Sequence, residues 1–189
     1  MESERRPELT PEPPTPEPVA PEPVTPEPVT PDLDAFKRAF RRHAAGVAIV
    51  TTLTPDGLPV GFTATSLASL SAVPPLATFN MARSASSWPA IVEAERVAIH
   101  MLGSRNRAVA ERLSGDHALR FVGDHWHAGP HGLPIIDGVT TWMICRIVER
   151  FEVHNSAVVV VQIEDGGAGE DDDALLYHER NYRLPGAEA

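Results

Sequence analysis

The stretch GFTATSLASLSAVPPL, residues 61–76, decides how this chain is interpreted, because small side chains crowd a segment where a core strand would carry bulky ones. Small residues let a planar ligand approach the backbone, whose free N–H and C=O groups can then pair with the polar edge of an aromatic heterocycle. The same composition fits an exposed edge strand rich in Ser and Thr. From this stretch alone the two interpretations are about equally good.

A second polar stretch follows at ARSASSWPAI, residues 82–91, where Ser84, Ser86 and Ser87 precede a predicted helix. A helix N-terminus offers unpaired amides and a partial positive charge, which suit a phosphate group. Arg83 would add a cation. Ordinary capping by serine is the better explanation of this stretch taken alone. Next to a candidate ring site, phosphate binding becomes the stronger hypothesis.

Short apolar segments separated by turn signals surround these two stretches. We expect strands over 46–53, 58–72, 76–81, 96–102, 139–153, 157–164 and 174–184, a turn at TPDG (54–57), and an acidic loop at 166–173. Helices between most strands, which a doubly wound parallel sheet requires, are absent. The sequence therefore predicts a mostly β fold, an antiparallel barrel with two or three peripheral helices.

Three helices are predicted from their caps and periodicity. The first follows Thr30 and Pro31 and carries Leu33, Phe36 and Phe40 on one apolar face. The second covers 86–95 with serine caps and Pro89 in its first turn. The third covers 104–115, with Ser104 as cap, Val109 and Leu113 on one side, and Gly115 as terminator.

The N-terminal segment differs in composition from the rest of the chain. Eleven of the nineteen prolines lie in residues 1–31, where a PEPV unit recurs, and residues 1–34 hold nine acids and two arginines. Proline blocks helices and central strands, and little here is apolar enough to drive burial. We predict an extended, disordered tail over 1–31 and one folded domain over 32–189. A solvated tail without a partner is favoured over a docking site for a proline-binding domain.

Composition excludes several classes of function. The net charge of −10, with no basic stripe, argues against a nucleic-acid partner. No apolar run is long enough to span a membrane, and the first residues do not resemble a signal peptide. Cys145 is the only cysteine, so no intrachain disulfide can form. We therefore expect a soluble, cytoplasmic protein.

Common catalytic and cofactor motifs are missing from the sequence. It contains no Gly-x-Gly-x-x-Gly, no Walker motif and no Gly-x-Ser-x-Gly. His125, His127 and His131 are spaced like metal ligands, but without a compelling carboxylate beyond Asp124 we interpret them as solvated loop histidines. The acidic run 170–173 lacks the ligand spacing of an EF-hand. We expect neither a metal ion nor a catalytic acid–base residue.

Five pieces of the chain resemble the flavin reductase family, whose members have the FMN-binding split-barrel fold. The pieces are FRRHAAGVAIVTT (40–52), VGFTATSLASLSAVPPLATF (60–79), RSASSWPAI (83–91), GLPIIDGVTTWMICRIVER (132–150) and LLYHERNYRL (175–184). The resemblance implies a homodimeric Greek-key split barrel. It also implies an oxidoreductase that reduces FMN, FAD or riboflavin with NADH or NADPH, often for a partner monooxygenase.

The resemblance also implies which residues bind the flavin. The residues that would line its ring, or lie near it, are Thr63, Ala64, Thr65, Ser66, Leu67, Ser69 and Ser71. The residues at its phosphate end would be Ser84, Ser86, Ser87 and Trp88. Hydride would then pass from the nicotinamide to the flavin, a reaction that the two cofactors carry and the protein supports by positioning.

The sequence departs from the family pattern at one place. Many members carry Gly-Asp-His just before the strand that corresponds to 157–163, and that His contacts the nicotinamide. Here Asn155 and Ser156 stand at the Asp and His positions, and His154 lies two residues upstream of Ser156, on the same strand face but roughly 7 Å away. His154 and Ser156 are therefore the candidates on the nicotinamide side. The alternative function is a non-catalytic flavin-binding protein with a degraded nicotinamide site.

Overall fold

The computed structural model describes residues 30–186, so most of the predicted tail lies outside the described residues. By its internal contacts the chain divides between Asp32 and Leu33. The helices and strands of the described residues all belong to the second unit, which begins at Leu33. Within the described residues no helix is long and apolar enough to cross a membrane.

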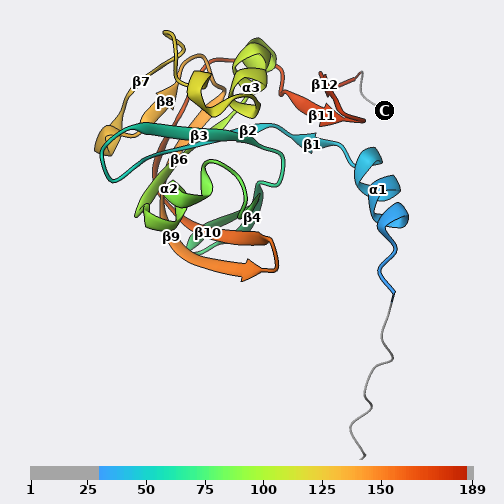
Figure 1. Ribbon diagram of the computed structural model, residues 1–189. Helices are drawn as coiled ribbons and strands as arrows, with labels where there is room; N and C mark the ends of the chain where they lie inside the picture. Colours follow the sequence, from blue (N-terminus) through green and yellow to red (C-terminus); the bar gives the residue numbers. More distant parts are fainter. Residues whose placement is uncertain (1–29, 187–189) are drawn as a thin grey trace, which may run out of the picture. The chain divides into compact units, whose positions relative to one another are not determined.

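An antiparallel sheet of seven strands forms the body of this unit (Figure 1). The order across the sheet is β3-β2-β6-β9-β10-β5-β4. The strands are β2 (Ala48–Leu53), β3 (Pro59–Ala64), β4 (Ala68–Ala72), β5 (Pro75–Ala82), β6 (Arg96–Met101), β9 (Thr141–Val153) and β10 (Ser156–Ala168). The prediction of a mostly antiparallel β fold with few helices is confirmed.

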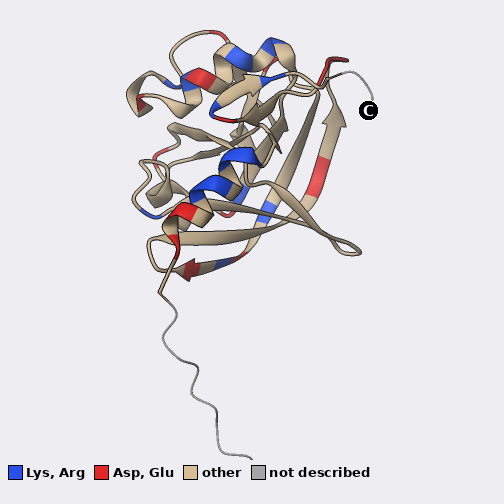
Figure 2. Cartoon of the chain, turned by 90° about the vertical axis from the view of Figure 1, so that its right-hand side faces the viewer, with Lys and Arg blue, Asp and Glu red and all other residues tan. Residues whose placement is uncertain are grey.

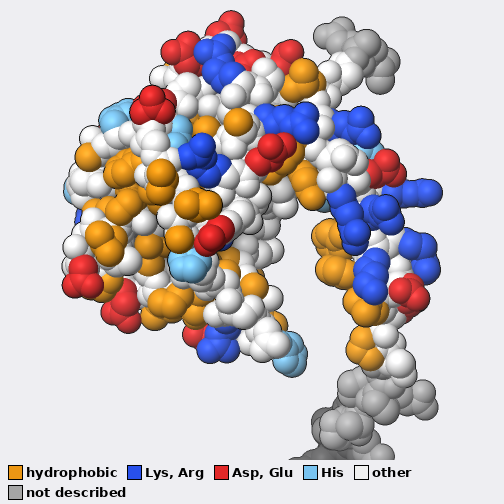
Figure 3. Space-filling view, turned by 45° about the horizontal axis from the view of Figure 1, so that its top comes forward, with side chains coloured by type: hydrophobic (Ala, Val, Ile, Leu, Met, Phe, Trp, Pro, Cys, Tyr) orange, Lys and Arg blue, Asp and Glu red, His pale blue; other side chains and the backbone are white. Residues whose placement is uncertain are grey.

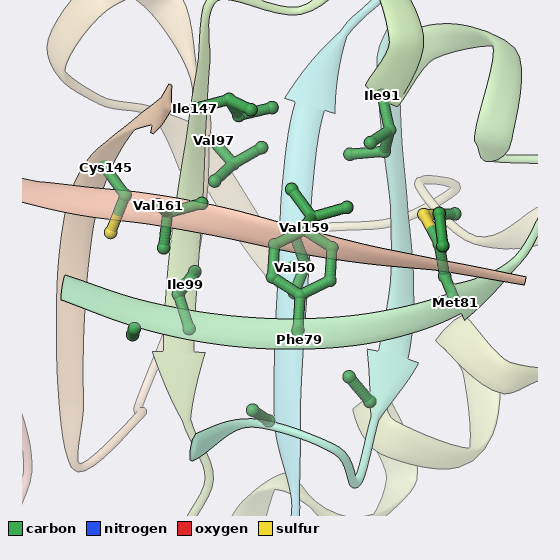
Figure 4. Close-up of a cluster of buried hydrophobic side chains, with 14 of the residues drawn as sticks. Val50, Phe79, Met81, Ile91, Val97, Ile99, Cys145, Ile147, Val159 and Val161 are labelled. Atoms are coloured by element: carbon green, nitrogen blue, oxygen red, sulfur yellow. The ribbon is translucent and has the colours of Figure 1, made fainter. Parts of the chain in front are cut away.

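The sheet curls around one apolar core, shown in Figure 4. Phe79 of β5 and Val159 of β10 are fully buried there, together with Val50 of β2 and Ile99 of β6. The Phe62 and Phe79 ring centroids lie 6.0 Å apart, which brings β3, at one end of the strand order, against β5, near the other. This closure makes the sheet a barrel and places the ends of β3 and β5 side by side.

Helices and short strands cover the outside of the barrel. The helices are α1 (Leu33–Arg42), α2 (Trp88–Glu93) and α3 (Arg107–Ser114), with 3-10 turns at Ser104–Asn106, His117–Leu119 and Pro130–Gly132. The remaining strands are β1 (Ala45–Gly46), β7 (Trp126–Ala128), β8 (Pro134–Ile136), β11 (Leu176–His178) and β12 (Asn181–Arg183). Leu113 of α3 packs with Ile49 and Leu175 in a second apolar cluster, so α3 is held against β2 from outside.

Three sequence predictions are corrected by the structure. The expected return strand 58–72 is two strands, because residues 65–67 leave β2 and β4 pairs instead with β5. The expected last strand 174–184 is a hairpin of β11 and β12, with Glu179 and Arg180 at φ of 50° and 64°. The expected acidic loop begins later than predicted, since β10 runs to Ala168.

The acidic segment is also more ordered than a solvated loop. The Asp172 carboxylate accepts hydrogen bonds from the Ser104 hydroxyl (2.7 Å) and from the backbone amide of Arg105 (2.9 Å). These bonds hold the pKa of Asp172 down at about 2. The Ser104 hydroxyl therefore ties down the segment after β10 and does not cap the third helix as predicted, since the residue that precedes α3 is Asn106.

The first helix has the predicted apolar face, but that face is exposed. Leu33, Phe36 and Phe40 are 59, 58 and 62% exposed, and the ring centroids of the two phenylalanines lie 4.6 Å apart. Figure 3 shows apolar side chains on one side of α1 and basic ones on the other. Figure 2 shows that Lys and Arg gather on α1.

The barrel strands bury two titratable side chains, His100 and Cys145. His100 of β6 is fully buried, with its Nδ1 3.2 Å from the Ile49 carbonyl oxygen and its Nε2 without a partner among the described residues. Burial lowers the pKa of His100 to about 4. Cys145 of β9 is also fully buried, and burial raises the pKa of its thiol to about 12.

Candidate functional site

A pocket of about 440 Å³ lies where the end of β3 meets the end of β5. We call it the small-residue pocket. Its lining residues are Phe62, Thr63, Ala64, Thr65, Ser66, Asn80, Met81, Ala82, Ala85, Ser86, Ser87, Leu113, Ser114 and Arg120. The pocket joins the two polar stretches that the sequence singled out, since residues 62–66 form one wall and residues 85–87 another.

The structure brings six of the predicted flavin contacts together in this pocket. They are Thr63, Ala64, Thr65, Ser66, Ser86 and Ser87. Leu67 instead packs against the barrel core, and Ser69 and Ser71 lie on β4, outside the lining. Ser84 is exposed in the turn after β5, and Trp88 is buried in the core at 8% exposure.

Ser66 fixes the loop between β3 and β4 to the neighbouring strand. Its hydroxyl donates to the Asn80 carbonyl (3.0 Å) and accepts from the Asn80 amide (2.9 Å). The Ser66 side chain therefore makes the two hydrogen bonds that a neighbouring strand would otherwise make to the backbone of Asn80. The backbone amides of Ser66 and Leu67 form no hydrogen bond with any described residue. Of these two, Ser66 lines the pocket, so its amide is a donor that can bond the edge of a ligand.

Two pocket hydroxyls are already engaged in holding the wall together. Thr63 Oγ1 donates to the Ala110 carbonyl of α3 (2.7 Å), which ties β3 to that helix. Ser87 Oγ donates to the Gly61 carbonyl (3.3 Å) and makes no capping bond to α2. The prediction of serine capping at this helix is therefore wrong. Because α2 has only six residues, its dipole is a weak basis for phosphate binding.

Arg120 is a pocket residue that the sequence did not identify. Its Nη1 donates to the Gly61 carbonyl (2.9 Å) and to Ser87 Oγ (3.0 Å), while Nε and Nη2 donate to the Gly115 carbonyl. Burial lowers the pKa of Arg120. Four of its five N–H groups are occupied, so Arg120 mainly positions Ser87 and brings one positive charge to the pocket. In the sequence, Arg120 begins a segment that is interpreted as a loop, and nothing near it in the sequence indicates this role.

Arg83, the cation expected at the phosphate end, points elsewhere. Its Nη2 forms an ion pair with Glu152 (2.8 Å), and its Nη1 donates to the carbonyl of His154 (3.1 Å). It therefore ties the end of β5 to the turn between β9 and β10. Arg83 does not line the small-residue pocket.

The two nicotinamide-side candidates take different places in this turn. Ser156 begins β10 directly opposite Ala82 of β5, and Ala82 lines the small-residue pocket. Directly opposed residues of an antiparallel pair point to the same face of the sheet. Ser156 therefore lies on the same face of the sheet as the Ala82 side chain, one strand away from a residue of the pocket lining, whereas His154 lies in the turn itself with φ of 51°.

Two of the three histidines in the 125–131 segment have hydrogen-bonding partners. His127 Nδ1 lies 2.6 Å from Asp137 Oδ1, and His125 Nε2 lies 2.9 Å from the Arg120 carbonyl. Across the part of the chain that the structure describes, no three His, Cys, Asp or Glu side chains come close enough to hold a metal ion.

Comparison with known proteins points to one family. Residues 40–185 match the flavin reductase like domain. The NADH:FMN oxidoreductase of Rhodococcus erythropolis is 37% identical over 155 residues, which cover 79% of this chain and 80% of that protein.

Two solved structures resemble this fold. A flavin reductase domain protein from Arthrobacter sp. FB24 is 51% identical, with a TM-score of 0.79 over 82% of this chain and 97% of that one. The nitrilotriacetate monooxygenase component B from Mycobacterium thermoresistibile is 28% identical, with a TM-score of 0.74 over 79% of this chain and 84% of that one. With its barrel, its small-residue pocket and these matches, the chain belongs to the flavin reductase like domain family.

Proposed function

We propose that this protein is an NAD(P)H:flavin oxidoreductase that binds FMN in the small-residue pocket and reduces it with a reduced nicotinamide. One observation carries the proposal. In a chain of the flavin reductase like domain family, six of the seven residues from Phe62 to Ser66 and from Ser86 to Ser87 are small, and all of them line one pocket. The NADH:FMN oxidoreductase of R. erythropolis supports FMN and NADH as the reactants.

The residues of the pocket fit a flavin ring. Small side chains leave about 440 Å³ next to the Phe62 ring, and the free amide of Ser66 suits the polar edge of an isoalloxazine. FAD and riboflavin carry the same ring and are expected to enter the same pocket. The Ser86 hydroxyl and the remaining N–H of Arg120 are the donors in the lining that we propose for the phosphate end. Ser84 stays a candidate contact there, and Trp88 would act by holding the loop in place.

Bound flavin supplies the electron-accepting ring, and the nicotinamide supplies the hydride. The protein then has to hold the two rings face to face and exclude water. Proton transfer by a side chain is not required for this step, which agrees with a pocket lined by hydroxyls and small apolar groups. Ser156, which pairs with Ala82 of the pocket lining, is the proposed contact on the nicotinamide side.

The rival function, flavin binding without reduction, depends on that same position. A serine hydroxyl can hydrogen-bond a carboxamide but cannot stack on a nicotinamide as an imidazole can. If neither NADH nor NADPH reduces bound flavin, the non-catalytic function is the correct one.

The assembly and the partner are also proposals. Family resemblance supports a homodimer, and sedimentation that finds only monomer at high concentration would contradict it. The relative named nitrilotriacetate monooxygenase component B supports a flavin-dependent monooxygenase as the consumer of reduced flavin. We also propose a cytoplasmic location, since a reducing compartment suits a chain whose one cysteine is a free thiol.

The proposed function is tested by binding and turnover with the purified full chain. Equilibrium dialysis against FMN, FAD and riboflavin should give micromolar or tighter binding of at least one flavin, roughly −8 kcal/mol. NADH and NADPH oxidation, followed by absorbance, should depend on added flavin. Failure to bind any flavin would refute the proposal, and binding without oxidation of either nicotinamide would leave the rival function.

A further inference from the structure

A second pocket of about 430 Å³ adjoins the small-residue pocket and is lined by residues of α3 and of the β11–β12 hairpin. We call it the hairpin pocket. Its own lining residues are Arg107, Glu111, Tyr177, Arg180, Asn181 and Tyr182. It shares Thr63, Thr65 and Ser114 with the small-residue pocket, so one ligand can extend from one pocket into the other.

The hairpin pocket carries an unneutralised positive charge. Arg107 Nε pairs with Glu111 Oε1 at 3.0 Å, one turn along α3, so these two charges largely cancel. Arg180 forms no ion pair or side-chain hydrogen bond with any residue that the structure describes. It sits in the hairpin turn at φ of 64°, held by the β11–β12 pairing on both sides. An arginine presented in this way, with five free donors, is suited to an anion such as a phosphate.

Aromatic surface lies next to this charge. The Tyr177 and Tyr182 rings pack edge to face with centroids 5.3 Å apart, and the Arg107 guanidinium lies over the Tyr182 ring at 5.9 Å. Burial raises the pKa of Tyr182, so its phenol stays a neutral donor at physiological pH. A planar base can pack against such tyrosines and a guanidinium plane.

We propose that the hairpin pocket binds the adenosine diphosphate portion of a dinucleotide whose other half occupies the small-residue pocket. This inference rests on the proposed function, because it takes the flavin or nicotinamide half to lie in the adjoining pocket. FMN ends at its phosphate and lacks the adenosine, whereas FAD and NADH both contain adenosine diphosphate. Arg180 would face the diphosphate, and Tyr177 and Tyr182 the adenine.

The test compares Arg180→Gln with Arg183→Gln, a matched control on the same hairpin that does not line the pocket. ADP binding is measured by calorimetry, FMN and FAD binding by fluorescence, and the NADH KM at saturating FMN. Losing one charge-assisted phosphate contact should weaken ADP binding roughly tenfold in Arg180→Gln. FMN affinity should stay within about twofold of wild type, and Arg183→Gln should match wild type throughout.

The dinucleotides show which molecule supplies the adenosine diphosphate. Weaker FAD binding with an unchanged NADH KM assigns the group to FAD, and the reverse result assigns it to NADH. A second variant, Glu111→Gln, removes the acid that neutralises Arg107, so ADP binding should tighten a few-fold.

Two results would overturn the inference. In the first, the ADP affinity, the FAD affinity and the NADH KM of Arg180→Gln all equal those of wild type. In the second, the FMN affinity of Arg180→Gln falls as much as its FAD affinity. A wild-type chain that binds ADP but no flavin would refute the proposed function instead. ADP binding by calorimetry needs no flavin, so the two failures are distinguishable.

Discussion

The buried His100 should make the protein sensitive to acid in a defined pH range. Its Nδ1 faces the Ile49 carbonyl at 3.2 Å, so Nδ1 carries the proton of the neutral ring and donates it. Nε2 is buried and has no partner among the described residues, so adding a proton there would place an N–H without an acceptor in the barrel wall. This desolvation is the main reason that the pKa of His100 falls to about 4.

The magnitude follows from the difference between the folded and unfolded pKa. A shift from 6.5 to about 4, at about 1.4 kcal/mol per unit, corresponds to about 3 kcal/mol of unfolding free energy. Between these two pH values the unfolded chain binds a proton at His100 that the folded chain does not. Stability is therefore complete above pH 6.5 and declines as the pH falls toward 4.

Urea unfolding, followed by tryptophan fluorescence from about pH 7.5 to about pH 4.5, measures this decline. The comparison variant is His100→Gln, which keeps a donor for the Ile49 carbonyl but cannot take up a proton. The control is His117→Gln, at a side chain that is 73% exposed. Wild type and the control should lose about 2–3 kcal/mol more than His100→Gln over this range. Parallel losses in all three proteins would refute the argument.

Three further results are expected. Ser156→His should lower the nicotinamide KM several-fold at saturating flavin, because an imidazole adds stacking worth about 1 kcal/mol. If His154→Ala abolishes turnover and Ser156→His has no effect, His154 is the nicotinamide contact instead. Removing residues 1–30 should leave the unfolding transition and flavin reduction intact, and an insoluble or inactive truncated protein would contradict this. Gly169→Ala should lower the unfolding free energy by roughly 1–3 kcal/mol in the same urea assay, because steric overlap is costly. The added Cβ would lie 1.9 Å from the Val139 carbonyl oxygen, and an unchanged midpoint would contradict the reasoning.

Much of the barrel could be predicted from the sequence because its strands are short, apolar and bounded by turn signals. Gly57 adopts φ of 79° in the predicted TPDG turn, and β5, β6 and β9 lie where expected. The β11–β12 hairpin could not be predicted, because its turn uses Glu179 and Arg180 at positive φ, which favours Gly, Asn or Asp.

The candidate site was predictable only where it is local in sequence. Residues 62–66 and 86–87 stand out as small and polar, and the structure places them in one pocket. Arg120 reaches the small-residue pocket through contacts that span long stretches of chain, such as its bond to the Gly61 carbonyl, and Arg180 lines the hairpin pocket together with Arg107 and Glu111 of the distant α3. A single sequence carries no sign of such pairings. The binding roles of all the predicted contacts, including Ser84, Trp88, His154 and Ser156, remain predictions.

Cys145 gives the chain an internal label for opening of the barrel. Only the thiolate reacts with thiol reagents, and this thiol is buried between β6 and β10 and has a pKa of about 12. Modification therefore has to wait until these strands separate, and because Cys145 is the only cysteine in the sequence, each molecule reports one event. A bound ligand slows opening by mass action, so the labelling rate reports occupancy even for ligands without colour or fluorescence, such as ADP.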